Sequence, residues 1–466
     1  MTGNITRLDA SRLAQLIASR ELSPVEVVQA HIDRIAEVDS KVNAIVTLAD
    51  GAMNAAKKAE AALMSGEKLG PLHGVPFTVK DSIDTAGVLT QRGSPIFKGR
   101  IPDTDATAVA RIKAAGGILI AKTNLPEFAY SVETDNLLTG RTNNPWNLDY
   151  TPGGSSGGES AAIAAGMSPL GLGSDVAIST RGPAAHTGIV GLKATHGRVP
   201  ASGHWPRVPR RFWHIGPMAR SVRDVALAYS LLAGPDGADG FSTIAPSVDT
   251  GTGTSNRPLR VGWLTDFFGP LDPEVAKTVK EAAKALSVAG CQVEEVSLPI
   301  LKETDGVTIF WKLQQMETRS VFEKVTAGHE DQVFNHVKAI FGTPDTSIED
   351  FVAGEQIMER LRDTFAEYFQ RYDVLLCPVT PFPATKHGLD DVVIDGQAFS
   401  PFQVMNATAI FSLTGNPAMT LRFGTSRDGL PIGVQIVSSW FAESTMFAAA
   451  LRLEEVSPVR DLHPAI

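Results

Sequence analysis

Short apolar runs alternate with helix-like patterns along most of the chain. The runs have the length of buried strands and are rich in Val, Ile and Leu. They lie at residues 75–79, 118–121, 170–172, 261–264, 374–377, 419–422 and 432–437. Strands that alternate with helices predict an α/β fold around a mixed sheet.

The N-terminal region, residues 1–65, has helical patterns and no candidate chemistry. Ser23 and Glu26 form a capping box around Pro24, which predicts a helix start. The Ala-rich segment 51–63 predicts a further helix packed outside the sheet. Residues 235–258 are rich in Gly, Ser, Thr, Asp and Pro, so we expect a surface loop and a partial domain boundary there.

The composition is typical of a soluble globular protein with a large core. The 466 residues are 43% hydrophobic and 20% charged, with a net charge of −9. This acidic balance argues against nucleic acid as a partner, because phosphate binding needs clustered Lys and Arg. Neither Cys291 nor Cys377 belongs to a CxxC pair, so we expect no zinc site and no disulfide. Cys377 lies within an apolar run and is expected in the core.

The sequence shows no pattern for membrane targeting. The N-terminus lacks a basic region followed by an apolar core, so no signal peptide is expected. No apolar run reaches the roughly 18 residues that span a bilayer. We therefore expect no membrane association and a cytoplasmic location.

A glycine-rich loop at 153–158 is the strongest chemical signal. It carries Ser155 and Ser156 and opens a helical segment. Its spacing is neither GxxxxGK[ST] nor GxGxxG, which argues against phosphate binding. Two interpretations remain, a tight turn capped by hydroxyls or a serine presented to a reaction centre. A second polar turn around Ser179, close behind in the sequence, favours a shared site.

Lys80 ends the apolar run 75–79. A surface charge is the ordinary role of a lysine, but the neighbouring residues are typical of a buried strand. A buried lysine loses proton affinity and can then accept a proton near neutral pH. A lysine base, a relay serine and a nucleophilic serine suffice for hydrolysis of an acyl compound.

At this point the ordered motifs resemble the amidase signature family. They lie at 74–81, 122–127, 142–147, 152–159, 173–175, 179, 181, 183–184, 191–193, 372–373, 377–378, 406, 415–418 and 429–435. The resemblance implies one large α/β domain over residues 1–466, with a twisted mixed sheet covered by helices on both faces. The core motifs would occupy 70–223 and 371–445, and the divergent section 224–370 would shape the substrate site.

The resemblance also implies a Ser–cis-Ser–Lys triad. Lys80 matches the general base, Ser155 the bridging serine and Ser179 the nucleophile. The peptide bond Gly154–Ser155 would be cis. No metal or organic cofactor is required for this chemistry.

The resemblance assigns the oxyanion hole to the backbone N–H groups of Val176, Ala177, Ile178 and Ser179. The family usually has two glycines directly before the nucleophile, where this chain has Ala177 and Ile178. A branched side chain at positive φ would be strained, so we expect negative φ at both residues.

Further residues are expected around the triad. Ser156, Asp175 and Arg181 would hold the catalytic loops, with Asp175 anchoring backbone amides. By the family alignment, Ala129 and Tyr130 lie beside the substrate.

The segment 201–214 contains two tryptophans, a phenylalanine, two histidines and three arginines. It is either a surface loop with anchoring aromatics or a pocket wall suited to bulky substrates. In the second interpretation, Trp205 would contact the substrate.

These observations favour a hydrolase of small-molecule carboxylic amides, with aryl or bulky groups, and with esterase and carbamate (urethane) hydrolysis as variants. One alternative is an amidotransferase A-type subunit for aminoacyl-tRNA amidation, which would need partner subunits. Another is a non-catalytic scaffold of the same fold. A homodimer is possible, because dimers are common among soluble enzymes.

Overall fold

One large mixed sheet forms the centre of the computed structural model, which describes residues 5–245 and 257–466. Its strand order is β1-β3-β2-β4-β6-β5-β12-β13-β9-β7-β8. The strands are β1 Ile45–Leu48, β2 Pro76–Lys80, β3 Ile118–Thr123, β4 Leu170–Asp175, β5 Val190–Lys193, β6 His214–Ala219, β7 Arg260–Trp263, β8 Gln292–Glu295, β9 Val374–Pro378, β12 Ala418–Thr425 and β13 Pro431–Ser438. Parallel pairs join β2 to its neighbours and β7 to its neighbours, and the other pairs are antiparallel.

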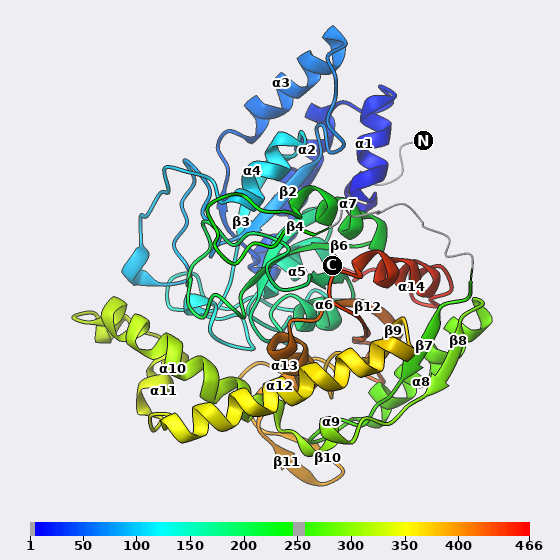
Figure 1. Cartoon of the computed structure of the whole chain (residues 1–466). Helices are drawn as coiled ribbons and strands as arrows, with labels where there is room; N and C mark the ends of the chain where they lie inside the picture. Colours follow the sequence, from blue (N-terminus) through cyan, green and yellow to red (C-terminus); the bar gives the residue numbers. More distant parts are fainter. Residues whose placement is uncertain (1–4, 246–256) are drawn as a thin grey trace.

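Helices cover both faces of the sheet (Figure 1). They are α1 Ala10–Ala18, α2 Pro24–Val42, α3 Ala52–Ser65, α4 Thr107–Ala114, α5 Gly157–Ala164, α6 Arg181–Thr187, α7 Val222–Leu232, α8 Pro273–Val288, α9 Pro299–Glu303, α10 Gly306–Thr326, α11 Asn335–Gly342, α12 Ile348–Arg371, α13 Asn406–Thr414 and α14 Glu443–Glu455. A short hairpin, β10 Val392–Ile394 and β11 Gln397–Phe399, lies outside the main sheet. The fold is thus the α/β architecture expected from the sequence.

Strand β9 shows how the two faces form separate cores. Val374 and Leu376 pack into one core, which includes residues of α1, α4, α7, α8 and α14. Leu375 and Cys377 pack into another, with residues of α9, α10, α12 and α13. Alternate residues of a strand point to opposite faces, so a continuous apolar run is what a doubly covered strand requires. Cys377 is fully buried, as expected.

The predicted strands are present, but the sheet has four more. β1 falls inside the region expected to be helical, and β5, β6 and β8 were not predicted. These strands span only four to six residues, and the side chains of β8 are mostly exposed, so no apolar run marks it. The region 1–65 is therefore not helical throughout, and its strand β1 pairs with β3 at one edge of the sheet.

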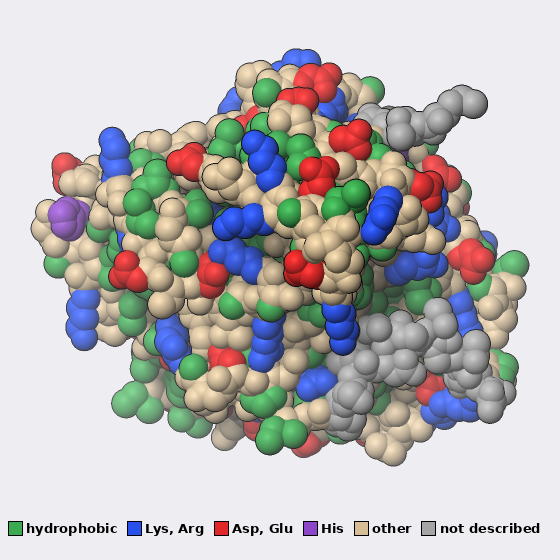
Figure 2. Space-filling view, turned by 90° about the horizontal axis from the view of Figure 1, so that it is seen from above, with side chains coloured by type: hydrophobic (Ala, Val, Ile, Leu, Met, Phe, Trp, Pro, Cys, Tyr) green, Lys and Arg blue, Asp and Glu red, His purple; other side chains and the backbone are tan. Residues whose placement is uncertain are grey.

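Part of the expected surface loop at 235–258 lies outside the described residues. Residues 235–245 form neither helix nor strand. Figure 2 shows acidic, basic and hydrophobic side chains interspersed on the face seen from above. Within the described ranges, no helix is both long and apolar enough to cross a membrane.

The capping box at the start of α2 gives a test of the fold. Ser23 Oγ accepts hydrogen bonds from the backbone N–H groups of Val25 and Glu26, and it donates to Glu60 of α3. We expect Ser23→Ala to lower the free energy of unfolding by about 1 kcal/mol, measured by urea denaturation. Ser65→Ala, at an exposed hydroxyl near the end of α3, is the matched control. Equal denaturation midpoints for the two variants would contradict this role of the cap.

Candidate active site

Three segments bring a lysine and several serines together beneath the surface. Lys80 ends β2, Ser155 and Ser156 precede α5, and Ser174 lies in the adjacent strand β4. Lys80 is fully buried, and its Nζ donates to Ser155 Oγ at 2.7 Å. It also reaches Ser156 Oγ and Ser174 Oγ, each at 3.0 Å. The lysine and the bridging serine named by the sequence are therefore in direct contact.

Burial changes the acidity of this lysine. Loss of solvent lowers the pKa of Lys80 to about 7, although Asp175 and Glu159 act in the opposite direction. Within the described residues, no carboxylate lies within ion-pair distance of its Nζ, and the nearest partners are hydroxyls. A substantial fraction of the side chain is then neutral at pH 7 and can accept a proton.

Close packing explains the glycines of the loop. The Gly154–Ser155 peptide bond is cis. A Cβ at Gly154 would lie 2.6 Å from the carbonyl oxygen of Ser131, and one at Gly158 would lie 2.4 Å from the carbonyl oxygen of Asn124. Neither position has room for a side chain, so the loop can settle against its neighbours only with glycine there.

Ser179 lies in the turn between β4 and α6 and lines a small pocket. Its carbonyl oxygen accepts a hydrogen bond from the Ser156 N–H at 3.1 Å, which joins the two serine-bearing segments. Among the described residues, Ser179 Oγ has no hydrogen-bond partner. In unliganded enzymes, the hydrogen bonds of catalytic groups often shorten only when substrate binds.

The residues around Ser179 that line the same pocket have backbone N–H groups without a protein acceptor in the described chain. Val176, Ala177, Ile178 and Ser179 all line it. Within the part of the chain that the structure describes, none of their N–H groups donates to a protein acceptor. Consecutive free N–H groups form a concavity that suits an anionic oxygen. Neither Ala177 nor Ile178 has a positive φ, as expected, so the turn holds its shape without glycine.

Arg181 and Asp175 hold this turn in place. The two side chains form a fully buried ion pair at 2.9 Å. Asp175 also accepts from the Thr180 N–H, and Arg181 donates to the Ala177 carbonyl oxygen at 2.9 Å. Burial alone would raise the pKa of Asp175, but Arg181 keeps it below its ordinary value. Because the Ala177 carbonyl oxygen accepts from Arg181, rotation of the peptide unit between Ala177 and Ile178 is restrained.

The pocket at Ser179 has a volume of about 20 Å³. Its lining includes Ala129 and Tyr130, which the sequence assigned to the substrate side. Residues of α10 and of the segment before α13 complete it, and the sequence had not assigned these to the site: Phe310, Trp311, Gln314, Phe402 and Met405. Within the described residues, this lining contains no Lys, Arg, His, Asp or Glu side chain.

Trp205 does not line this pocket and belongs instead to an aromatic cluster behind it. Its ring lies 4.9 Å from Phe128 and 5.3 Å from Phe97, between ring centroids. Residues 201–213 form no named helix or strand, and buried aromatic side chains anchor them, which agrees with the interpretation of a loop with anchoring aromatics. Phe212 and Trp213 of this segment are almost fully buried, and it leads into strand β6.

Two polar residues of the site were missed in the sequence. Ser174 adds a third hydroxyl around Lys80. Glu159, on the first turn of α5, is fully buried and accepts from Thr78 and Thr123. Burial raises the pKa of Glu159 to about 7. Both residues stand inside the family motifs, next to Asp175 and after the glycine loop.

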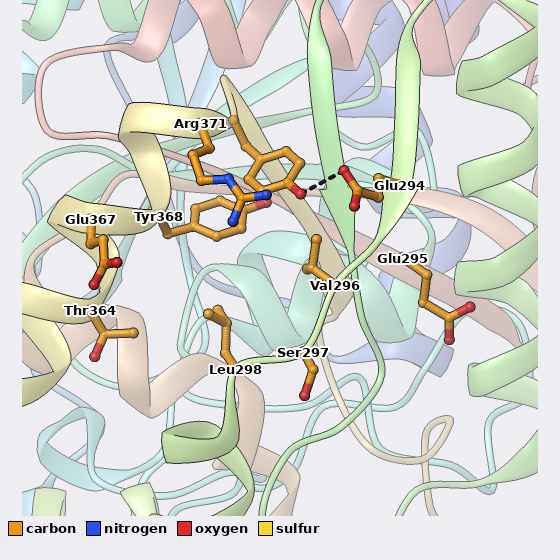
Figure 3. Close-up of a pocket in the computed structure, with 10 residues that line it drawn as sticks. Glu294, Glu295, Val296, Ser297, Leu298, Thr364, Glu367, Tyr368 and Arg371 are labelled. Carbon is orange, nitrogen blue, oxygen red and sulfur yellow. Dashed lines mark hydrogen bonds between the residues drawn. The ribbon is translucent and has the colours of Figure 1, made fainter.

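A larger hollow lies at the edge of the sheet that β8 forms, between β8 and the end of α12 (Figure 3). It has a volume of about 320 Å³, and its lining contains Glu294, Glu367 and Arg371. Tyr372 Oη donates to Glu294 at 2.7 Å. This lining includes no member of the triad, so the hollow is not the candidate catalytic pocket.

Comparisons with known proteins agree with this geometry. The amidase family model matches residues 26–447. The A-type subunit of a Glutamyl-tRNA(Gln) amidotransferase from Symbiobacterium thermophilum is 36% identical over 98% of this chain and 99% of its own length.

Solved structures resemble the fold over nearly its full length. A 6-aminohexanoate cyclic dimer hydrolase, complexed with substrate, has a TM-score of 0.88 at 29% identity and covers 99% of each chain. A bacterial aryl acylamidase has a TM-score of 0.89 at 27% identity and covers 97% of this chain and 96% of its own. The chain belongs to the amidase signature family.

Proposed function

We propose that this protein hydrolyses uncharged carboxylic amides through an acyl-enzyme on Ser179. The observation that carries the proposal is the 2.7 Å contact between Lys80 Nζ and Ser155 Oγ, beside a turn with four unused N–H donors. These are the parts that acyl transfer needs, a base, a relay, a nucleophile and an oxyanion site.

The proposed reaction begins with neutral Lys80. Lys80 accepts a proton from Ser155, and Ser155 accepts a proton from Ser179. At the same time Ser179 Oγ attacks the carbonyl carbon of the substrate. The oxyanion receives hydrogen bonds from N–H groups of the 176–179 turn, where one donor contributes about 3–4 kcal/mol in other acyl-transfer enzymes. The relay returns the proton to the leaving nitrogen as the C–N bond breaks. Water then attacks the acyl-enzyme by the same route and releases the acid.

The uncharged pocket lining supports a neutral substrate. A charged group buried there without a partner would lose its hydration, and no ion pair would compensate for that loss. Esters and carbamates present the same carbonyl and are proposed as further substrates. An ester has an oxygen in place of the amide nitrogen, and a carbamate has an oxygen on one side of the carbonyl and a nitrogen on the other. An ester also needs less proton transfer to its leaving group.

A second candidate is the ammonia-releasing subunit of an amidotransferase. The 36% identity to an amidotransferase A-type subunit over 98% of this chain favours it. However, a zwitterionic amide donor such as free glutamine carries an ammonium and a carboxylate group. Neither the described lining of the Ser179 pocket nor that of the adjoining cavity beside Tyr130, Trp311 and Phe402 has a Lys, Arg, Asp or Glu side chain to pair with either group. The sequence comparisons therefore support the amidotransferase subunit, while the uncharged lining is the observation on which we base the proposal of a hydrolase of neutral amides.

The triad is tested with one aryl group presented as an anilide, an ester and a carbamate. We expect wild-type protein to cleave at least the anilide, and Ser179→Ala and Lys80→Ala to lower kcat by about 10⁴-fold or more. Thermal unfolding of each variant controls for folding. A Ser179→Ala variant that keeps its activity would remove Ser179 as the nucleophile. Inert wild-type protein whose Ser179 also resists a fluorophosphonate would favour a non-catalytic scaffold.

The pH dependence follows from the lysine. A base must be unprotonated, so kcat/KM should rise with pH through an ionisation near 7 and then level off. Lys80→Arg, which keeps a positive charge at every accessible pH, should be inactive throughout this range. A kcat/KM that falls as pH increases from about 6 to about 8 would contradict the assignment of Lys80 as the base.

The two candidate functions differ in their response to charge on the substrate. We expect kcat/KM for L-glutamine to be at least about 100-fold below that for an uncharged anilide, measured by ammonia and aniline release. A preference for glutamine, or glutaminase activity that appears only with co-purified partner subunits, would reverse the order of the two candidates.

A further inference from the structure

The cavity at Ser179 is too small to hold a whole substrate. Its volume of about 20 Å³ compares with about 10–15 Å³ for a single water position, so it accepts little more than a carbonyl group. Pockets for small molecules usually measure about 300–1,000 Å³. Most of any amide substrate must therefore lie outside this inner chamber.

A second cavity adjoins the inner chamber. It has a volume of about 280 Å³, and we call it the outer chamber. Tyr130, Trp311 and Phe402 line both chambers. Trp311 stands at their junction, with ring centroids 5.3 Å from Tyr130 and 5.8 Å from Phe402. The two chambers therefore share these three side chains as a common wall, and a substituent that extends from Ser179 toward Trp311 would reach the outer chamber.

The remaining wall of the outer chamber comes largely from α11. His336, Ala339 and Ile340 of this helix line it. Within the described residues, the lining has no Lys, Arg, Asp or Glu side chain. Burial lowers the pKa of His336 and so favours its neutral form, although Glu133 and Asp135 act in the opposite direction. The chamber lining is therefore largely aromatic and aliphatic, with the uncharged polar side chains of Gln315 and Thr343 beside His336.

We infer that the outer chamber binds the larger apolar substituent of the amide, an aryl or alkyl group, while only the scissile carbonyl enters the inner chamber. This inference rests on the proposed amide hydrolysis. Ala339 is exposed on α11 and contributes only a small side chain to the lining, so a larger side chain at this position should restrict the size of the bound substituent. Each methylene buried there should raise kcat/KM about fourfold.

Three substrates and two variants test the inference. Acetanilide is compared with octananilide, which is longer on the acyl side, and with 4-hexylacetanilide, which is longer on the amine side. We expect wild-type protein to prefer one of the longer substrates over acetanilide, which also shows which side of the amide enters the chamber. Ala339→Trp, which fills the chamber, should lower that preference by at least about tenfold.

Lys338→Trp is the matched control, because Lys338 is exposed on the same helix and does not line the chamber. It should leave the preference unchanged. The inference would be overturned if wild-type protein cleaved acetanilide with the same kcat/KM as both longer substrates. An Ala339→Trp variant that keeps the wild-type preference would also overturn it.

Binding separates this inference from the proposed function. The Ser179→Ala variant is titrated calorimetrically with octananilide and 4-hexylacetanilide, with and without Ala339→Trp. Wild-type protein could hydrolyse none of the compounds while Ala339→Trp still weakens their binding by about tenfold or more. That result would support the binding chamber and contradict amide hydrolysis. If neither compound binds, or if Ala339→Trp leaves the affinity unchanged, the inference is wrong whatever the hydrolysis assay shows.

Discussion

The burial of Lys80 is the constraint on which the rest of the site depends. Its Nζ sits among hydroxyl groups, without a carboxylate in ion-pair distance in the described chain. Lys122 on the neighbouring strand is equally buried but has Asp81 at 3.5 Å. The hydroxyls around Lys80 can accept or donate, so they accommodate either protonation state. A direct carboxylate partner would instead favour the charged form and remove the base.

The same burial dictates the backbone around it. Serine-bearing segments must approach β2 closely, and Gly154 and Gly158 permit this where a Cβ would meet the carbonyl oxygens of Ser131 and Asn124. The turn at Ser179 is held differently, by the buried pair of Arg181 and Asp175. The glycine-rich loop therefore packs closely because its glycines lack side chains, whereas the buried ion pair of Arg181 and Asp175 holds the turn at Ser179. This explains how Ala177 and Ile178 can stand where the family usually has glycine.

Much of this arrangement could be predicted from the sequence. Strands buried on both faces, such as β9, appear as continuous apolar runs. The motifs also identified Lys80 and Ser155, which are in contact, and Ser179, whose carbonyl oxygen is hydrogen-bonded to the neighbouring Ser156. Strand β8 could not be found this way, because its exposed polar residues pair only through the backbone.

Long-range packing determines the positions of the aromatic side chains near the site, which the local sequence does not show. Trp205 was expected beside the substrate, but its position depends on Phe97 and Phe128, and local sequence does not show which way an aromatic ring will face. The sequence likewise did not show that α10 contributes to the pocket lining. Its aromatic residues were visible in the sequence, but only tertiary packing places Trp311 at the junction of two chambers while Phe322 lies in the core.

The central claim is that Ser179 carries the acyl group during turnover. Mass spectrometry of protein quenched during hydrolysis of an activated ester, followed by peptide mapping, tests it most directly. The account predicts an acyl adduct on Ser179 that is lost in Ser179→Ala and forms far more slowly in Lys80→Ala. An adduct on Ser155, or hydrolysis at full rate with Ser179 unmodified, would contradict it.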